Sequence, residues 1–189
     1  MLEYISIPKS VICLNGNPFS DWNGKLECLS PNFIYADDVL FNKDKSEIVS
    51  FRNQNIESYI IPDSVISIGD GAFYSCSSLS NIVIPNSVTD IGDYAFWECS
   101  SLTNIVIPDS VTDIGNSAFE YCSSLSNIVI SNSVTDIGDG AFAYCSFLSN
   151  IVIPDSVTNI GNGAFHGCSL SYDFRQELIS RFGEKIIGL

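Results

Sequence analysis

The side chains best suited to chemistry are one histidine and seven cysteines. His166 and Cys168 lie two positions apart and could offer two ligands to a metal ion, but a zinc site needs three or four. No Cys-x-x-Cys pair occurs. Serine is abundant, but activating it requires a histidine base held beside it, and no such arrangement is evident. We therefore predict no catalytic residue, no metal site and no cofactor, and we interpret His166 as an exposed side chain without a task.

The acidic residues fall into rows at a fixed spacing. Asp90, Asp113 and Asp136 form one row; a second combines aspartates with two asparagines: Asp63, Asn86, Asp109, Asn132 and Asp155. Carboxylates stacked about 5 Å apart repel one another and could be relieved by Ca²⁺. The Gly-Gly-x-Gly-x-Asp motif of calcium β-rolls is absent, however. The sequence favours solvated turns, with a calcium- or glycan-binding module as a distant alternative.

Five of the cysteines also recur at one spacing: Cys76, Cys99, Cys122, Cys145 and Cys168. The sequence favours a ladder of small, buried, reduced thiols, since free cysteine is among the most buried residue types. Disulfides or a thiolate metal site are the alternatives.

All these rows follow from a repeat of 23 residues, which begins at Ile56, Leu79, Leu102, Leu125 and Leu148. Such a period indicates a solenoid, whose units bury their apolar faces by stacking. In the copy from Leu79, alternation over residues 82–84 predicts a short strand that pairs in parallel with its neighbours, and Pro85 ends it. Gly92 fits a turn with positive φ, and Asp93 reads as the N-cap of a short helical turn over residues 94–99. Phe96 and its equivalents should stack as a spine.

The chain departs from the repeat in three places. Residues 1–24 match a first repeat with no polar cap before Leu2, so this end could associate with another molecule or lack an upstream segment. Residues 25–55 form an irregular repeat in which two strands around residues 42–45 predict an inserted β-hairpin. Residues 56–170 contain five regular repeats. Residues 171–189 carry apolar residues at helical spacing and predict a C-terminal capping helix.

Two surfaces are candidates for binding. The first is a stripe of outward-facing strand residues flanked by an asparagine row: Ile60, Val83, Val106, Val129 and Val152 with Asn81, Asn104, Asn127 and Asn150. Exposed apolar stripes often mark interaction sites, although β-propensity alone could explain the valines. The second surface is where the copies differ and aromatic residues gather: Tyr74, Tyr94, Trp97, Glu98, Glu120, Tyr121, Tyr144 and His166. Aromatic side chains suit protein recognition, while drift at unconstrained positions is the alternative.

Composition excludes several classes of partner. The chain has a formal net charge of −14, which argues against nucleic acid and against an anionic membrane surface. No run of about 20 apolar residues could span a bilayer, and no N-terminal segment has the pattern of a secretion signal.

The pattern IPDSVTxIGxxAFxxCSSL resembles the BspA-like, treponemal-type leucine-rich repeat proteins of bacterial surfaces, closely over residues 56–170 and more loosely over 2–22. The resemblance implies a curved right-handed α/β solenoid with a concave parallel sheet and short helical turns opposite, and no enzymatic activity. It also implies secretion or surface exposure and adhesion to proteins such as those of the host extracellular matrix. The expected function is a protein-binding module of a bacterial surface protein, with a structural or self-associating spacer as the alternative.

Overall fold

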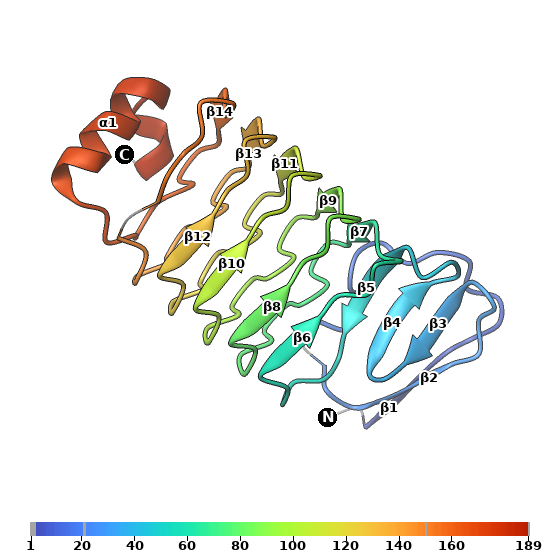
Figure 1. Cartoon of the computed structure of the whole chain (residues 1–189). Helices are drawn as coiled ribbons and strands as arrows, with labels where there is room; N and C mark the ends of the chain where they lie inside the picture. The colour runs from blue at the N-terminus through green and yellow to red at the C-terminus, as the bar shows by residue number, and fades with distance from the viewer. Residues whose placement is uncertain (1–2, 21, 150, 189) are drawn as a thin grey trace.

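The computed structural model describes residues 3–20, 22–149 and 151–188. The chain is a β-solenoid of about seven turns with one C-terminal α-helix (Figure 1). Two parallel sheets run along its axis. The front sheet has three-residue strands: β6 (Ser58–Ile60), β8 (Asn81–Val83), β10 (Asn104–Val106) and β12 (Asn127–Val129). The second sheet has two-residue strands: β7 (Ser67–Ile68), β9 (Asp90–Ile91), β11 (Asp113–Ile114), β13 (Asp136–Ile137) and β14 (Asn159–Ile160).

The front sheet stacks equivalent residues in register. Asn104 pairs with Asn81 on one side and with Asn127 on the other, and Val106 pairs with Val129. Ile105 is 1% exposed, because the middle residue of each strand points into the core while its neighbours point outward. The predicted parallel pairing is confirmed.

The second sheet was not predicted, because a strand of two residues is too short to show an alternating pattern. Its residues pair in the same 23-residue register, as Asp113 does with Asp136 and Ile114 with Ile137. The isoleucine of each pair is buried and the aspartate faces outward.

The short helical turns expected at residues 94–99 and at the equivalent positions of the other repeats are absent from the described repeats. This prediction was wrong. Residues 93–98 form consecutive turns. Amides in this segment alternate between two acceptors: Trp97 donates to the carbonyl of Tyr94 within the coil, whereas Phe96 donates to Ala118 in the next coil. An α-helix uses its amides within its own segment. Stacking therefore replaces the helix with hydrogen bonds along the solenoid axis.

Gly92 and Asp93 also have different roles from those predicted. Gly92 and its equivalents at 69, 115, 138 and 161 do not have positive φ. Instead, a Cβ atom on Gly115 would lie 2.5 Å from the carbonyl carbon of Gly92, so glycine is required by the close approach of two coils. Asp93 caps no helix: its Oδ1 accepts a hydrogen bond from the amide of Asn116, one coil further on, at 2.6 Å.

Residues 25–55 contain more strands than the single predicted hairpin. β3 (Phe33–Ala36), β4 (Val39–Asn42) and β5 (Glu47–Phe51) form an antiparallel meander, and β5 joins the second sheet through β7. The additional turn lies at Asp37 and Asp38, which both have positive φ, the backbone of a type I′ hairpin turn. Aspartate tolerates this conformation better than most residues, and the meander follows from that turn.

The meander separates two hydrophobic cores. Val39, Phe41 and Ile48 join the main core of the regular repeats. Leu40 and Val49 point the other way, into a smaller core with Ile7 and other residues of the first two coils. There β1 (Tyr4–Ile7) pairs in parallel with β2 (Lys25–Cys28), as a sheet separate from the front sheet. Leu2, on which the prediction of an uncapped end rests, lies outside the described residues.

The main core is built from rows of identical side chains. The phenylalanine rings of successive coils lie 4.8 to 5.6 Å apart, and their planes are within 28° of parallel: Phe51, Phe73, Phe96, Phe119, Phe142 and Phe165. The predicted spine is therefore confirmed, and Phe51 of the meander extends it by one ring.

The C-terminal cap combines α1 (Tyr172–Phe182) with a 3₁₀ helix, η1 (Glu184–Ile187). Ser171 caps α1 by accepting a hydrogen bond from the amide of Phe174. The carbonyl of Lys185 accepts from the amide of Gly163, as the carbonyl of Asn162, 23 residues earlier, accepts from Gly140. The cap thus satisfies amides of the last coil as a further repeat would.

Candidate binding surfaces

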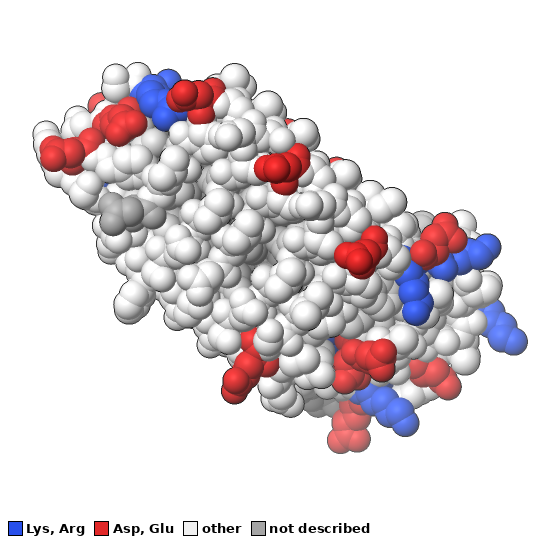
Figure 2. Space-filling model, in the orientation of Figure 1, with Lys and Arg blue, Asp and Glu red and all other residues white. Residues whose placement is uncertain are grey.

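The valine stripe is exposed along the front sheet. We use this name for Ile60, Val83, Val106, Val129 and Val152, whose side chains are 47 to 80% exposed. The first four lie in strands of the front sheet, whereas Val152, which was predicted to lie in a strand, is assigned to none. Carboxylates lie toward the margins of the face in Figure 2, and Lys and Arg lie near the two ends of the molecule. The middle of this face is uncharged and suits a partner surface that is itself apolar or neutral.

The asparagine row borders the stripe. Asn81, Asn104 and Asn127 are exposed and in register, whereas Asn150 lies outside the described residues. Asn81 donates to the hydroxyl of Ser58 at 3.3 Å, and Asn104 donates to the hydroxyl of Thr103 at 2.9 Å. An amide has two donors and two acceptor lone pairs, so each retains capacity for a partner.

Aromatic rings of the second predicted surface form a continuous row over five coils, in which stacked and edge-on contacts alternate. We call Tyr74, Trp97, Tyr121, Tyr144 and His166 the aromatic ladder; neighbouring ring centroids lie 4.5 to 5.4 Å apart. Tyr121 and Tyr144 are almost parallel, with 1° between their planes. The rings pack on one another and stabilise the outer turns, which explains aromatic residues here without a ligand. Tyr94 belongs to none of these ring pairs.

His166 is not the freely exposed side chain that we predicted. It is half-buried, its ring meets Tyr144 edge-on, and its Nδ1 lies 3.2 Å from the carbonyl oxygen of Ile187 in η1. Because a carbonyl only accepts, Nδ1 carries the proton of this hydrogen bond. His166 therefore joins the last repeat to the cap.

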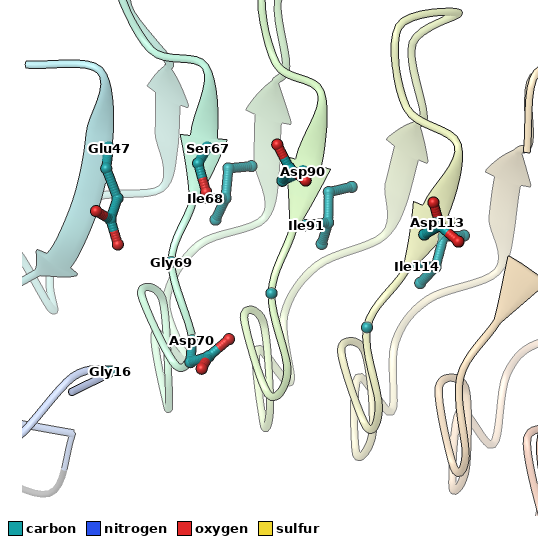
Figure 3. A pocket seen from close by; sticks show the side chains of 12 residues that line it. Gly16, Glu47, Ser67, Ile68, Gly69, Asp70, Asp90, Ile91, Asp113 and Ile114 are labelled. Atoms are coloured by element: carbon teal, nitrogen blue, oxygen red, sulfur yellow. The ribbon is translucent and has the colours of Figure 1, made fainter.

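An acidic trough of about 360 Å³ follows the second sheet (Figure 3). Glycines, among them Gly69 and Gly92, line it together with Glu47, Asp70, Asp90 and Asp113. Burial, and secondarily the charge of Asp70, raises the pKa of Glu47. Thr89 donates to the Asp90 carboxylate at 2.5 Å. The carboxylates are spread along the axis, and no group of three potential ligands that could hold a metal ion occurs among the described residues.

The five cysteines of the repeats form a buried row of free thiols, as the favoured interpretation predicts. Cys99 donates to the carbonyl of Phe73 and Cys122 to that of Phe96, each at 3.1 Å. Burial raises the pKa of the Cys168 thiol to about 12, so these cysteines stay protonated and unreactive near neutral pH.

Sequence reasoning missed how unevenly the charge is distributed. The regular repeats, residues 56–170, contain twelve Asp and Glu and no Lys or Arg; all eight Lys and Arg lie at or before Arg52, or at or after Arg175. The signal was present in the printed sequence, because sorting charge by segment rather than summing it over the chain reveals it.

A protein-family model described as the BspA type leucine rich repeat region matches this chain in six copies, which span residues 44–171. This match covers most of the chain. The chain belongs to the BspA-type leucine-rich repeat family. None of the curated proteins matches the chain significantly.

Several solved structures are similar to this BspA-type repeat chain. A leucine rich cell surface protein from Faecalibacterium prausnitzii is 32% identical with a TM-score of 0.61, covering 75% of this chain and 43% of its own. The pneumococcal vaccine antigen PcpA is 25% identical with a TM-score of 0.56, covering 90% and 38%. A leucine rich repeat protein of T. pallidum shares the fold at 22% identity with a TM-score of 0.56, covering 84% and 97%.

The BspA-type chain spans well under two thirds of the length of the first two of these relatives, 43% and 38%. Among the described residues, neither helix is both long and apolar enough to cross a membrane.

Proposed function

We propose that this chain is a non-enzymatic protein-binding segment of a bacterial surface or secreted protein, and that it binds through the valine stripe. The exposure of this stripe in register along an uncharged face is the observation that supports the proposal. Membership of a family whose solved relatives include a cell surface protein supports the location. We treat residues 1–189 as one leucine-rich repeat domain.

The stripe offers several apolar side chains at the spacing of the coils. Val106 is 59% and Val129 is 50% exposed, and fully burying a valine contributes about 1.5 kcal/mol or more. Two such side chains, with asparagine amides beside them, can anchor a neutral protein surface. Adhesion to the extracellular matrix is the partner class that the family resemblance favours, and it belongs to the same proposal.

The test replaces Val106 and Val129 by aspartate and measures binding to an immobilised basement-membrane extract by biolayer interferometry. We expect affinity to fall at least about tenfold, because burying two new carboxylates costs more than 1.4 kcal/mol. A Val106→Thr, Val129→Thr variant keeps the β-branched shape and should lose less.

The matched control is Asn86→Asp with Asn132→Asp. It adds the same two charges at exposed turn positions where other copies already carry Asp63, Asp109 and Asp155. Binding should be unchanged in this control, and circular dichroism should show an intact fold in all variants. Equal binding by the Val106→Asp, Val129→Asp variant would remove the stripe from the binding surface.

A further inference from the structure

A groove runs along the turns that follow the second sheet, on a different segment of each coil from the valine stripe. It consists of two depressions, of about 210 and 480 Å³, that share Tyr94 as a common wall. Small side chains, or none, leave the space of the groove unfilled. Gly71 lines the first depression, and Ser117, Gly140 and Gly163 line the second. We call it the turn groove.

Tyr94 is the one large residue in this row, and its backbone is strained. The row has positive φ in all five copies: Gly71, Tyr94, Ser117, Gly140 and Gly163. Three copies use glycine, for which this conformation carries no steric penalty. Tyr94 adopts it at φ 57°, at a cost of roughly 1–2 kcal/mol for a residue with a Cβ atom.

The fold gains little in return for this strain. The Tyr94 side chain is 47% exposed, and it makes no ring stack and no side-chain hydrogen bond with the described residues. Tyr121 and Tyr144 also have positive φ, but they stack on each other at 4.6 Å and so contribute to packing. Tyr94 is therefore the aromatic side chain of the turns that packing does not explain.

The walls of the groove define the chemistry of its occupant. Asp93, Glu120 and Asp139 line the larger depression beside Tyr94 and Tyr144. No Lys or Arg occurs between Arg52 and Arg175, so no Lys or Arg of the repeats neutralises these carboxylates, and His166 is the one basic side chain among the residues that line the depression. Arginine matches such a surface, because its planar guanidinium stacks on tyrosine rings and pairs with carboxylates in a bidentate manner.

We propose that the turn groove binds an arginine-bearing segment of a partner protein, with Tyr94 as the ring on which a guanidinium stacks. The carboxylates of Asp93, Glu120 and Asp139 pair with its charges. This site is separate from the valine stripe and does not depend on the function proposed for that stripe.

The first test uses a fluorescent peptide in which arginine alternates with serine, titrated with the full chain at low ionic strength. The variant is Tyr94→Gly, which supplies the residue that three other copies use at this position. We expect affinity to fall about fivefold to tenfold through the loss of one cation–π contact, while the midpoint of thermal unfolding is unchanged or higher. The same peptide with lysine in place of arginine should bind several-fold more weakly.

A matched pair of charge variants separates the groove from general attraction. Asp93→Asn with Asp139→Asn removes two groove carboxylates but keeps the acceptor, as Asn116 Oδ1 accepts from the amide of Asp139 at 2.9 Å. Asp109→Asn with Asp155→Asn removes the same charge at turn positions where Asn86 and Asn132 stand in other copies. The groove pair should weaken binding about tenfold, and the turn pair less than about twofold.

Two results would overturn the proposal. Equal loss from both pairs would show only non-specific attraction to an acidic protein. Full affinity in the Tyr94→Gly variant, with its fold confirmed by circular dichroism, would remove the tyrosine from the site. Either result leaves the valine stripe untouched, since that surface is tested with a different probe and different variants.

Discussion

At the scale of single residues, the glycines at 69, 92, 115, 138 and 161 set how closely the coils approach. A Cβ atom on Gly115 would lie 2.5 Å from the carbonyl carbon and 2.6 Å from the carbonyl oxygen of Gly92. Both are backbone atoms, which cannot move away as a flexible side chain can. The spacing of the coils therefore depends on the absence of a side chain at this position.

We expect Gly115→Ala to destabilise the chain by roughly 2–4 kcal/mol, because the coils must separate to admit the methyl group. Gly163→Ala is the control: its φ is 62°, but the nearest atom, Cβ of His166, would lie 3.7 Å away. That change should cost only the backbone strain of a positive φ, roughly 1–2 kcal/mol. Urea unfolding followed by circular dichroism measures both, and equal midpoints would contradict the close-approach explanation.

Sequence reasoning predicted residue roles well where one side chain decides them. Ile82, Phe96 and Cys99 are buried as expected, because apolar residues that recur at a fixed period must face the core shared by the stacked coils. It failed for Gly92 and Asp93, whose roles depend on the neighbouring coil. A residue type that recurs at one position in every copy indicates a structural constraint. The period alone does not show whether that constraint is a contact within one coil or a contact between two coils.

At the scale of elements, the cap is joined to the last repeat by side-chain packing as well as by backbone hydrogen bonds. Leu178 of α1 and Ile186 of η1 are both 0% exposed. Arg181 donates to the carbonyls of Ile153 and Pro154, each at 3.4 Å. The cap therefore shields the end of the core that stacking would otherwise leave open.

We predict that Leu178→Ala loosens this end and destabilises the chain by about 2–4 kcal/mol, the usual effect of emptying a buried leucine site. Glu177→Ala, one residue earlier and exposed, should change stability by less than about 0.5 kcal/mol. Hydrogen exchange should show the loss of protection concentrated in residues 148–188. Protection that falls evenly over the whole array would contradict a local role for the cap.

The capping helix was predictable and the outer turns were not. Phe174, Leu178 and Phe182 show helical spacing, and α1 uses that spacing within one segment. Residues 94–99 look like a short helix in sequence, yet half of their amides donate to carbonyls of the next coil. Local patterns predict an element whose hydrogen bonds are local, and miss one completed by its neighbours.

At the scale of the whole molecule, the regular repeats are a rod of one charge sign. Twelve carboxylates without a Lys or Arg repel one another along residues 56–170, and like charges lie in register, as Asp113 does beside Asp136. Such self-repulsion destabilises a compact state and is screened by salt. Net charge indicated an acidic protein, but only the stacked structure shows the charges aligned.

We expect the midpoint of thermal unfolding to rise by several degrees between about 0.02 and 0.3 M NaCl, as the screening length shortens. Asp109→Asn with Asp155→Asn should raise the midpoint at low salt and reduce the gain from salt. Differential scanning fluorimetry measures both effects. A midpoint that does not change with salt would show that this repulsion is too weak to affect stability.

The cap also makes the length of the array adjustable. The carbonyl of Lys185 accepts a hydrogen bond from the amide of Gly163. Lys185 lies 23 residues after Asn162, whose carbonyl accepts from Gly140, so the cap keeps the register of the earlier coils. Insertion of one further 23-residue unit between Phe147 and Leu148, or deletion of the unit that ends at Phe147, would leave the meander and the cap unchanged. Every junction between coils would keep its present geometry. The length of the solenoid, its charge and the number of binding positions would then change together in equal steps. Recombination between copies can therefore alter the length of such a protein without changes to either end.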